Sequence, residues 1–321
     1  MSSQVLIQEN ETQRVASPIV ECVPNFAEGR DADKVREIVR AIQVEGVHLL
    51  DWSLDPDHNR SVVTIAGAPE AVLESAVRGV GKAAELIDLT QQKGEHPRMG
   101  AADVVPFVPV SGISLPQCVL LARQAGMEIW KRFGVPVYFY EAAASRPDRV
   151  RLENVRRGEF EGLSLAAMKD STRQPDIGGP GIHPTAGASA IGARHFLIAY
   201  NITLHARRGK ADVGLARTVA KDVRASSGGL YGVKAMGVMV NGHAQVSMNV
   251  TDFRHTPMAR VHAAVAESAN RHGGMVGDGE LIGLIPEQAF EPNSDWVRQI
   301  VGFNPDERVL ERRLLHPLAW P

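Results

Sequence analysis

The sequence predicts an α+β fold in which two β-α-β-β-α-β units follow one another along the chain. Two observations predict this class. Short apolar runs alternate with stretches that carry apolar residues at helical spacing, and the same order of elements occurs twice. The chain has 321 residues, of which 44% are hydrophobic and 22% charged, so each unit can bury a core of its own.

The first unit is predicted between residues 19 and 110, and its order of elements is that of a ferredoxin-like domain. Its helices show an apolar stripe on one side, and Pro69 suits the first turn of a helix. A further helix and strand extend this unit. The predicted elements are a strand over 19–23, a helix over 31–42, strands over 47–52 and 61–66, a helix over 69–87, a strand over 104–110, and then the extra helix over 115–133 and strand over 135–140.

The second unit repeats the order after residue 194. Asn241 and Gly242 form the residue pair that best fits a tight primed turn, and they predict a hairpin. The halves share little sequence identity, so the repeat is one of architecture. The predicted elements are a strand over 195–204, a helix over 213–225, hairpin strands over 233–240 and 243–250, a helix over 258–271 and a strand over 275–285.

These patterns divide the chain into three parts. Residues 1–17 are polar and mixed in charge, and we expect a disordered extension. Residues 18–177 are expected to form the N-terminal subdomain and 178–321 the C-terminal one. The join over 141–194 is rich in arginine, glycine and proline and is predicted to be irregular. Ligand sites favour domain interfaces, so this join is a candidate region for binding.

Composition excludes several classes of protein. The formal net charge of −2 creates no overall field that would attract nucleic acid or an anionic membrane. Neither a signal peptide nor an apolar run long enough to span a bilayer is present. Cys22 and Cys118 lie in apolar contexts and are expected to be buried thiols of a reducing compartment. We therefore expect a cytoplasmic protein.

The segment GEHPRMG, residues 94–100, is the most informative motif. Pro97 biases the residue before it away from the α region, so His96 is expected on an extended or turning backbone between a helix and a strand. Imidazole titrates near neutral pH, and a histidine held in this way suits proton transfer. The alternative is a histidine that only stabilises the turn.

A second motif, PDIGGPGIHPTAGASAIGAR, spans residues 175–194. Its glycines allow a backbone to approach a ligand closely, and its prolines restrict the loop. It matches neither a phosphate loop nor a dinucleotide fingerprint. The motif is compatible both with a loop that contacts a ligand and with a flexible interdomain linker.

A third segment, LDPDHNRSVV from Leu54, places polar residues directly before a strand. Arg60 could pair with a carboxylate, and Asn59 could orient an amide or imine. Asp55 and Asp57 lack the remaining ligands of a calcium site, and turn formation is an equal alternative. The histidines of the chain show no HExxH or CxxC spacing, so no metal is expected.

Several long motifs resemble those of glutamate formiminotransferases, the formiminotransferase domain of the formiminotransferase-cyclodeaminase family. In the first half these are IVECVPNFAEGRD, DPDHNRSVVTIAG, LIDLTQQKGEHPRMGAADVVPFVPV and GVPVYFYEAA; in the second they are PDIGGPGIHPTAGASAIGARHFLIAYNI, AQVSMNVTDF, GELIGLIP and GFNPDERVLERRL. The resemblance covers residues 18–313 in order. Because the chain stops soon afterwards, the cyclodeaminase activity of the animal enzymes is expected to be absent.

The resemblance implies two ferredoxin-like subdomains with the substrates between them. It implies transfer of the formimino group from N-formimino-L-glutamate to tetrahydrofolate, giving 5-formiminotetrahydrofolate and glutamate in histidine degradation, without a metal. The general acid/base maps to His96, since one imidazole can remove a proton from the attacking nitrogen and protonate the leaving one. Family members are commonly dimers, so a homodimer is expected. The folate-binding segment maps to Gly178, Gly179, Pro180, Gly181, Ile182, His183, Pro184, Thr185, Ala186 and Gly187.

The substrate-binding residues are less closely defined. The animal enzymes carry a second acid where this chain has Ser53, which leaves the role of the nearby aspartates open. Glu95 or an aspartate could set the tautomer of His96. Both substrates carry carboxylates, and arginines that flank the histidine loop are the first candidates to pair with them. The substrate-binding candidates are Asp55, Asn59, Arg60, Glu95 and Arg98, with Arg194 and Arg254 ranked after the other arginines.

Three other functions are compatible with parts of this pattern. Formyl transfer between folate and glutamate could use the same histidine. A non-catalytic folate-binding protein would be expected to show an altered histidine loop, and here the loop is intact. A metal-dependent hydrolase of formiminoglutamate would need clustered ligands that the sequence lacks.

Overall fold

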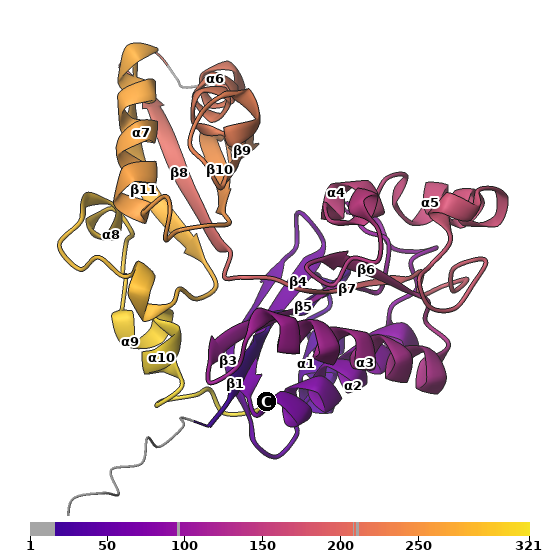
Figure 1. Ribbon diagram of the computed structural model, residues 1–321. Helices are drawn as coiled ribbons and strands as arrows, with labels where there is room; N and C mark the ends of the chain where they lie inside the picture. The colour runs from indigo at the N-terminus through magenta and orange to yellow at the C-terminus, as the bar shows by residue number, and fades with distance from the viewer. Residues whose placement is uncertain (1–16, 95–96, 208, 210–211) are drawn as a thin grey trace, which may run out of the picture.

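The computed structural model describes residues 17–94, 97–207, 209 and 212–321, which form two β-sheets with helices packed against them (Figure 1). The first sheet has seven strands in the order β1-β4-β2-β5-β7-β6, with β3 beside β4. The second has four strands in the order β11-β8-β10-β9. The predicted α+β class with two sheets is confirmed.

The first unit places three helices on one face of its sheet. The Asp31 side chain caps the first helix by accepting bonds from two backbone amides, and Ser114 with Gln117 forms a capping box at the third. These helices and the sheet enclose the first core. The elements are β1 (Ile19–Cys22), β2 (Asn25–Phe26), α1 (Ala32–Ala41), β3 (Val47–Asp55), β4 (Arg60–Gly67), α2 (Pro69–Leu86), β5 (Ala102–Ser111), α3 (Leu115–Phe133) and β6 (Val137–Glu141).

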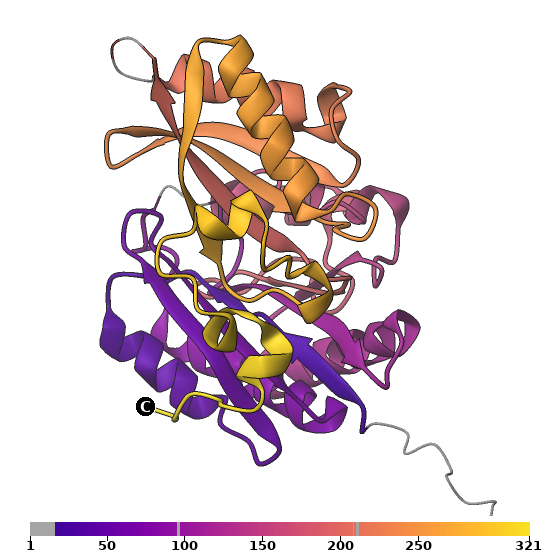
Figure 2. The same ribbon diagram turned by 90° about the vertical axis from the view of Figure 1, so that its left-hand side faces the viewer.

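The second unit follows the predicted order closely. All three strand pairs are antiparallel, and Asn241 and Gly242, with φ of 49° and 77°, make the predicted primed turn. Helices cover one face of this sheet (Figure 2). The elements are β8 (Ile198–Ala206), α6 (Val213–Val223), β9 (Val233–Val240), β10 (His243–Val250), α7 (Met258–Arg271) and β11 (Gly274–Ile282).

The second face of the first sheet has two different partners. Leu50, Ala66 and Val108 join the core of the second unit. Nearer β6, the sheet is covered by α4 (Leu152–Val155) and α5 (Glu159–Lys169), which enclose a third, smaller core. The first sheet is therefore covered on both faces, whereas helices cover one face of the second sheet.

The C-terminal segment crosses from the second unit back to the first (Figure 2). It contains α8 (Asp295–Arg298), α9 (Pro305–Arg308) and α10 (Leu310–Arg313). Arg313 then donates to the Leu50 carbonyl at 2.9 Å, and the Leu318 amide donates to the Leu49 carbonyl at 2.8 Å. This segment ties the two units together at β3.

The region between the units differs from the sequence prediction. Residues 141–194 were expected to be irregular, but they contain α4, α5 and a strand, β7 (Ser189–Ala193), which pairs in parallel with both β5 and β6. All five residues of β7 are buried, so the strand shows no polar alternation to reveal it. This pairing favours a division between the units after Ala193 rather than at the predicted residue 178.

Three other expectations from the sequence concern the cysteines, membrane-spanning helices and the N-terminal extension. Cys22 and Cys118 are buried free thiols, as predicted. Within the described ranges, no helix combines the length and apolar character needed to cross a membrane. Residues 1–16 of the predicted extension lie outside the described residues.

Candidate functional site

A small polar hollow lies where β2, β4 and β5 meet the loop that follows α2. Asn25 comes from β2, Arg60 begins β4, and Asp103 is the second residue of β5. The hollow is lined by Asn25, Phe26, Ala27, Asn59, Arg60, Arg98 and Asp103. Three of the predicted substrate-binding candidates, Asn59, Arg60 and Arg98, are therefore brought together here.

Asp103 and Arg156 form a buried ion pair at this hollow, and neither was predicted from the sequence. One carboxylate oxygen of Asp103 lies 2.5 Å from the Arg156 guanidinium, with the two side chains 4% and 15% exposed. The other oxygen accepts a 2.8 Å bond from the Met99 amide. Asp103 thus anchors the backbone three residues after His96.

Arg60 lies next to this pair. Its guanidinium donates to the Asn25 side-chain carbonyl. Burial, followed by the charge of Arg156, lowers the pKa of Arg60, and the charges of Asp103 and Asp55 oppose that effect. An arginine stays cationic at neutral pH even so.

Arg98 is held by the protein itself. Its guanidinium makes bonds of 2.8 and 3.2 Å to the two carboxylate oxygens of Glu161 and one of 3.1 Å to the Gln92 carbonyl. A bidentate arginine–carboxylate pair has strong directional preference, so Arg98 joins its loop to α5. This geometry favours a structural role for Arg98 over contact with a substrate.

Asn59 and Asp55 shape the neighbouring turn. Asn59 adopts a φ of 51°, accepts from the Gly29 amide and donates to the Lys93 carbonyl, both at 2.9 Å. Asp55 accepts from the His58 amide and contacts the His58 ring at 2.6 Å, and its side chain is half exposed. These contacts favour the turn-forming alternative for both residues.

The glycine-rich loop lies directly beside the segment that follows His96. The Ala188 amide donates to the Met99 carbonyl at 3.0 Å, and the Ala101 amide donates to the Ala186 carbonyl at 2.9 Å. A Cβ on Gly187, where φ is 69°, would lie 2.1 Å from the Met99 carbonyl oxygen, so only glycine fits. The loop is therefore not a flexible linker over residues 185–188. Glu95 and His96 themselves lie outside the described residues.

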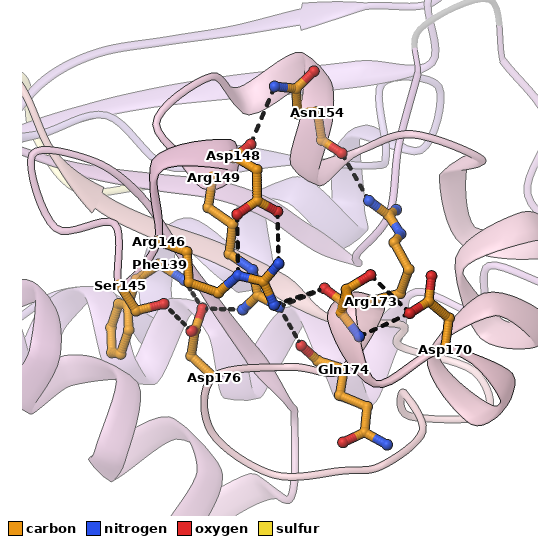
Figure 3. Close-up of polar contacts among 11 residues, drawn as sticks. Phe139, Ser145, Arg146, Asp148, Arg149, Asn154, Asp170, Arg173, Gln174 and Asp176 are labelled. Atoms are coloured by element: carbon orange, nitrogen blue, oxygen red, sulfur yellow. Dashed lines mark hydrogen bonds and ion pairs between the residues drawn. The ribbon is translucent and has the colours of Figure 1, made fainter.

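A buried arginine network fixes the chain where it enters this loop (Figure 3). Arg149 pairs with Asp176 at 2.6 Å, with the side chains 6% and 10% exposed, and also donates to the Thr172 and Gln174 carbonyls. Asp176 in turn accepts from the Phe139 amide of β6 at 2.8 Å. The sequence showed only that the join is rich in arginine. One of these arginines, Arg149, holds residues 172–176 in place.

The remaining candidates lie elsewhere. Arg194 is placed after β7 and donates to the His195 carbonyl at 3.0 Å. Arg254 is exposed in the second unit, over the Phe253 ring and 3.2 Å from the Gln288 side chain. Across the residues that the structure describes, no group of three His, Cys, Asp or Glu side chains could hold a metal ion.

The fold and the site together define a two-sheet α+β protein with a small hollow, lined by arginine, asparagine and aspartate side chains, where β2, β4 and β5 meet the loop that follows α2. Two family models cover nearly all of this architecture. The N-terminal subdomain of the formiminotransferase domain matches residues 19–194, and the formiminotransferase domain matches residues 199–301. The chain belongs to the formiminotransferase domain family.

Curated relatives extend this assignment over almost the full length. A glutamate formimidoyltransferase of Thermoplasma acidophilum is 42% identical over 300 residues, which is 92% of this chain and 97% of that protein. The glutamate formimidoyltransferase of Streptococcus pyogenes serotype M1 is 40% identical, covering 92% and 99%. The formimidoyltransferase-cyclodeaminase of Gallus gallus is 41% identical over 85% of this chain but only 51% of its own length. The resemblance to the family inferred from sequence motifs is confirmed.

Proposed function

We propose that this protein is a glutamate formimidoyltransferase that moves the formimino group of N-formimino-L-glutamate to tetrahydrofolate, giving 5-formiminotetrahydrofolate and L-glutamate in histidine degradation. One observation carries the proposal. Proteins that bear this enzyme name align with 92% of the chain at 40–42% identity, and the alignments cover 97% and 99% of their own lengths.

The described part of the site supports this substrate pair. N-Formimino-L-glutamate and folate both carry carboxylates, and Arg60 lines the hollow beside the Asp103–Arg156 pair. We assign Arg60 as the first candidate for a substrate carboxylate. Arg98 is assigned to the structure of the loop because Glu161 already occupies its guanidinium.

The glycine-rich loop is the proposed contact for folate. Its second half is fixed by main-chain bonds to residues 99–101 and also to Leu89, whose amide donates to the Thr185 carbonyl at 2.9 Å. A ligand that meets a preformed loop loses less free energy to ordering than one that meets a flexible one. The loop also lies beside the segment that follows His96, so a ligand on it would be near the proposed acid/base.

His96 is proposed as the general acid/base on the strength of the family motif. A proton must leave the attacking folate nitrogen, and another must reach the departing glutamate nitrogen. An imidazole near its own pKa can accept the first and supply the second. Asp103 contributes by holding the Met99 amide, and holding both reactants in place supplies much of the rate advantage of a group transfer.

The test is a turnover assay on the purified chain. Glutamate release from N-formimino-L-glutamate is followed with and without tetrahydrofolate, together with the folate spectrum. We expect release that requires folate, and a loss of at least about 100-fold in kcat for His96→Ala, the size expected for a general acid/base. The control is His243→Ala, which removes an exposed histidine at the start of β10.

Each other outcome has a defined meaning. Release without folate would replace the transferase by a hydrolase, and a chelator would then show whether a metal takes part. Turnover with an N-formyl donor alone would change the group that is transferred. Full activity in His96→Ala would leave the transferase in place and remove the proposed acid/base.

Further parts of the proposal rest on the family. We propose that tetrahydrofolate is the co-substrate and that no metal is needed, that the chain acts as a homodimer, and that it works in the cytoplasm. Activity after dialysis against a chelator tests the second point, and light scattering during gel filtration tests the third.

A further inference from the structure

The two edges of the second sheet differ in how well they are protected. The sheet has β11 at one edge and β9 at the other (Figure 1). The β11 edge is interrupted by a register shift between Val276 and Gly279, and the Gly279 amide donates to the Gln299 carbonyl at 3.0 Å. It also carries two exposed acids, Asp278 and Glu280. Bulges, covering segments and charges are features that prevent a sheet edge from pairing with another chain.

The β9 edge is regular and open. Its register with β10 runs without a shift from Val233 to Val240. Apart from that ladder, the described residues make one backbone hydrogen bond with β9, in which the Val233 amide donates to the Leu230 carbonyl at 3.3 Å. A strand of an antiparallel sheet directs backbone amides and carbonyls to both sides, so the outer side of β9 presents a row of these groups. An extended strand is the partner that can pair with them.

The side chains of β9 make this edge apolar. Met236 and Met239 are 60% and 44% exposed. Methionine side chains adapt to irregular surfaces and are enriched at protein interfaces. Lys234 is the one charged residue of the strand, and its ammonium group already pairs with the Glu153 carboxylate at 2.6 Å. The edge therefore lacks the charge that protects β11.

The position of Lys234 suits pairing with an identical strand. Two copies related by a two-fold axis perpendicular to the sheet place their β9 strands antiparallel. The two Lys234 residues then lie at opposite ends of the shared ladder, and the exposed methionines lie between them. A parallel arrangement would bring the two lysines together, and like charges opposite each other destabilise a strand pair. The strand is thus self-complementary in the antiparallel direction.

We propose that two copies of this chain pair antiparallel through their β9 edges, so that their second sheets form one continuous sheet. The inference rests on the homodimer included in the proposed function and deepens it by naming the strand that forms the interface. The hollow assigned to the substrate lies at β2, β4 and β5 of the first unit. Turnover therefore tests the proposed reaction, and chain mass tests the interface.

A charge on the strand provides the first test. Met239→Lys adds a lysine to β9, and Met275→Lys is the matched control because Met275 lies on β11 with 45% exposure against 44% for Met239. Light scattering during gel filtration of a dilution series gives the mass. We expect a wild type with the mass of two chains. Met239→Lys should raise the dimer dissociation constant at least about 10-fold, because it places two like charges in one interface. Met275→Lys should leave the constant unchanged, and circular dichroism checks that both variants are folded.

A cross-link tests the geometry directly. Met236 lies at the middle of β9, so antiparallel pairing brings this position in one copy close to the same position in the other. Oxidised glutathione should convert Met236→Cys to a disulfide-linked dimer that dithiothreitol returns to single chains. Met275→Cys should stay as single chains on the same gel. Cys22 and Cys118 are buried in both variants and leave the background low.

Other results overturn the inference. A wild type with the mass of one chain would remove the dimer and leave β9 to an extended peptide of another protein. A dimer that Met239→Lys does not weaken, or that Met275→Lys weakens equally, would place the interface elsewhere. A stable dimer in which Met236→Cys gives no cross-link would exclude this strand pairing. Each of these results leaves the transferase reaction in place, whereas a wild type that dimerises through β9 without transferring the formimino group contradicts the reaction alone.

Discussion

The two units share an order of elements but differ in what they bury. Among the described residues, every buried acidic residue and every buried arginine belongs to the first unit or to the join attached to it: Glu21, Glu28, Arg98, Asp103 and Arg149. The buried polar residues of the second unit are Gln245, Thr256, His262 and Ser268. Burying charge costs free energy unless each charge is paired. The first unit and the join therefore hold the buried carboxylates and guanidinium groups, whereas the second unit buries none among the described residues.

The largest expected effect comes from breaking the Asp103–Arg156 pair. Arg156→Met leaves the buried Asp103 carboxylate without its partner, and we expect a loss of about 3–5 kcal/mol in the free energy of unfolding. Denaturant unfolding measures this loss. Activity should also fall, because the same carboxylate holds the Met99 amide.

An exposed pair in the second unit provides the control. Asp295 and Arg298 are 74% and 63% exposed, so Arg298→Met should cost less than about 1 kcal/mol. Restoring charge balance in the double variant Asp103→Asn with Arg156→Met should recover part of the stability. Equal costs for the buried and the exposed pair would contradict the contrast between the units.

The next effect concerns Glu21, which lies on β1 between Ala66 and Val108 and is 4% exposed. Burial raises the pKa of Glu21 to about 7; the charge of Arg194 opposes the shift, and that of Glu311 adds to it. The folded state holds this proton more tightly than the unfolded state does. The stability that results is complete below pH 4.5 and is lost as the pH rises from there through 7.

Glu21→Gln should remove this part of the pH dependence. Above pH 7 we expect the variant to be more stable than the wild type by at most about 3 kcal/mol, and near pH 4.5 the two should converge apart from a small constant difference. Melting temperatures measured between pH 4.5 and 8.5 check the slope. Glu267→Gln, on the exposed side of α7, should leave the slope unchanged. Parallel curves for Glu21→Gln and the wild type would show that Glu21 does not titrate in this range.

The sequence predicts the second unit better than the first, and the reason is physical. The helices and strands of the second unit have one buried and one polar side, and this periodicity is visible in the residues themselves. The β7 strand is buried on all sides and carries alanine and glycine, so nothing in its pattern distinguishes it from the loop before it. Gly192 is small because the Tyr140 ring lies against it, a contact that only the fold reveals.

The candidate site shows the same limit. Motif spacing predicted that the loops with Arg60 and Arg98 and the glycine-rich loop matter, and the structure brings the described parts of them together. The sequence could not show that Glu161 pairs with the guanidinium of Arg98, because the two residues lie 63 positions apart in the chain. Asp103 and Arg156 were missed for the same reason. The one available signal was an aspartate at the start of a long apolar strand.

The smallest expected effect compares one tyrosine hydroxyl in each unit. The Tyr138 hydroxyl donates to the Arg173 carbonyl at 2.6 Å, beside the entry to the glycine-rich loop. The Tyr200 hydroxyl is buried in the second core and has no hydrogen-bond partner among the described residues. Its ring packs edge-on against Trp296 at 5.9 Å, and burial raises its pKa.

Removing the two hydroxyls should change stability in opposite directions. Tyr138→Phe leaves the Arg173 carbonyl without its donor and should cost about 1 kcal/mol, whereas Tyr200→Phe removes an unsatisfied polar group and should gain up to about 1 kcal/mol. Urea unfolding of the two variants against the wild type measures both changes. A loss in Tyr200→Phe as large as that in Tyr138→Phe would mean that the Tyr200 hydroxyl has a partner in solution, and the second core would then hide a polar contact of its own. A gain would show that the second core tolerates a buried polar atom that makes no hydrogen bond.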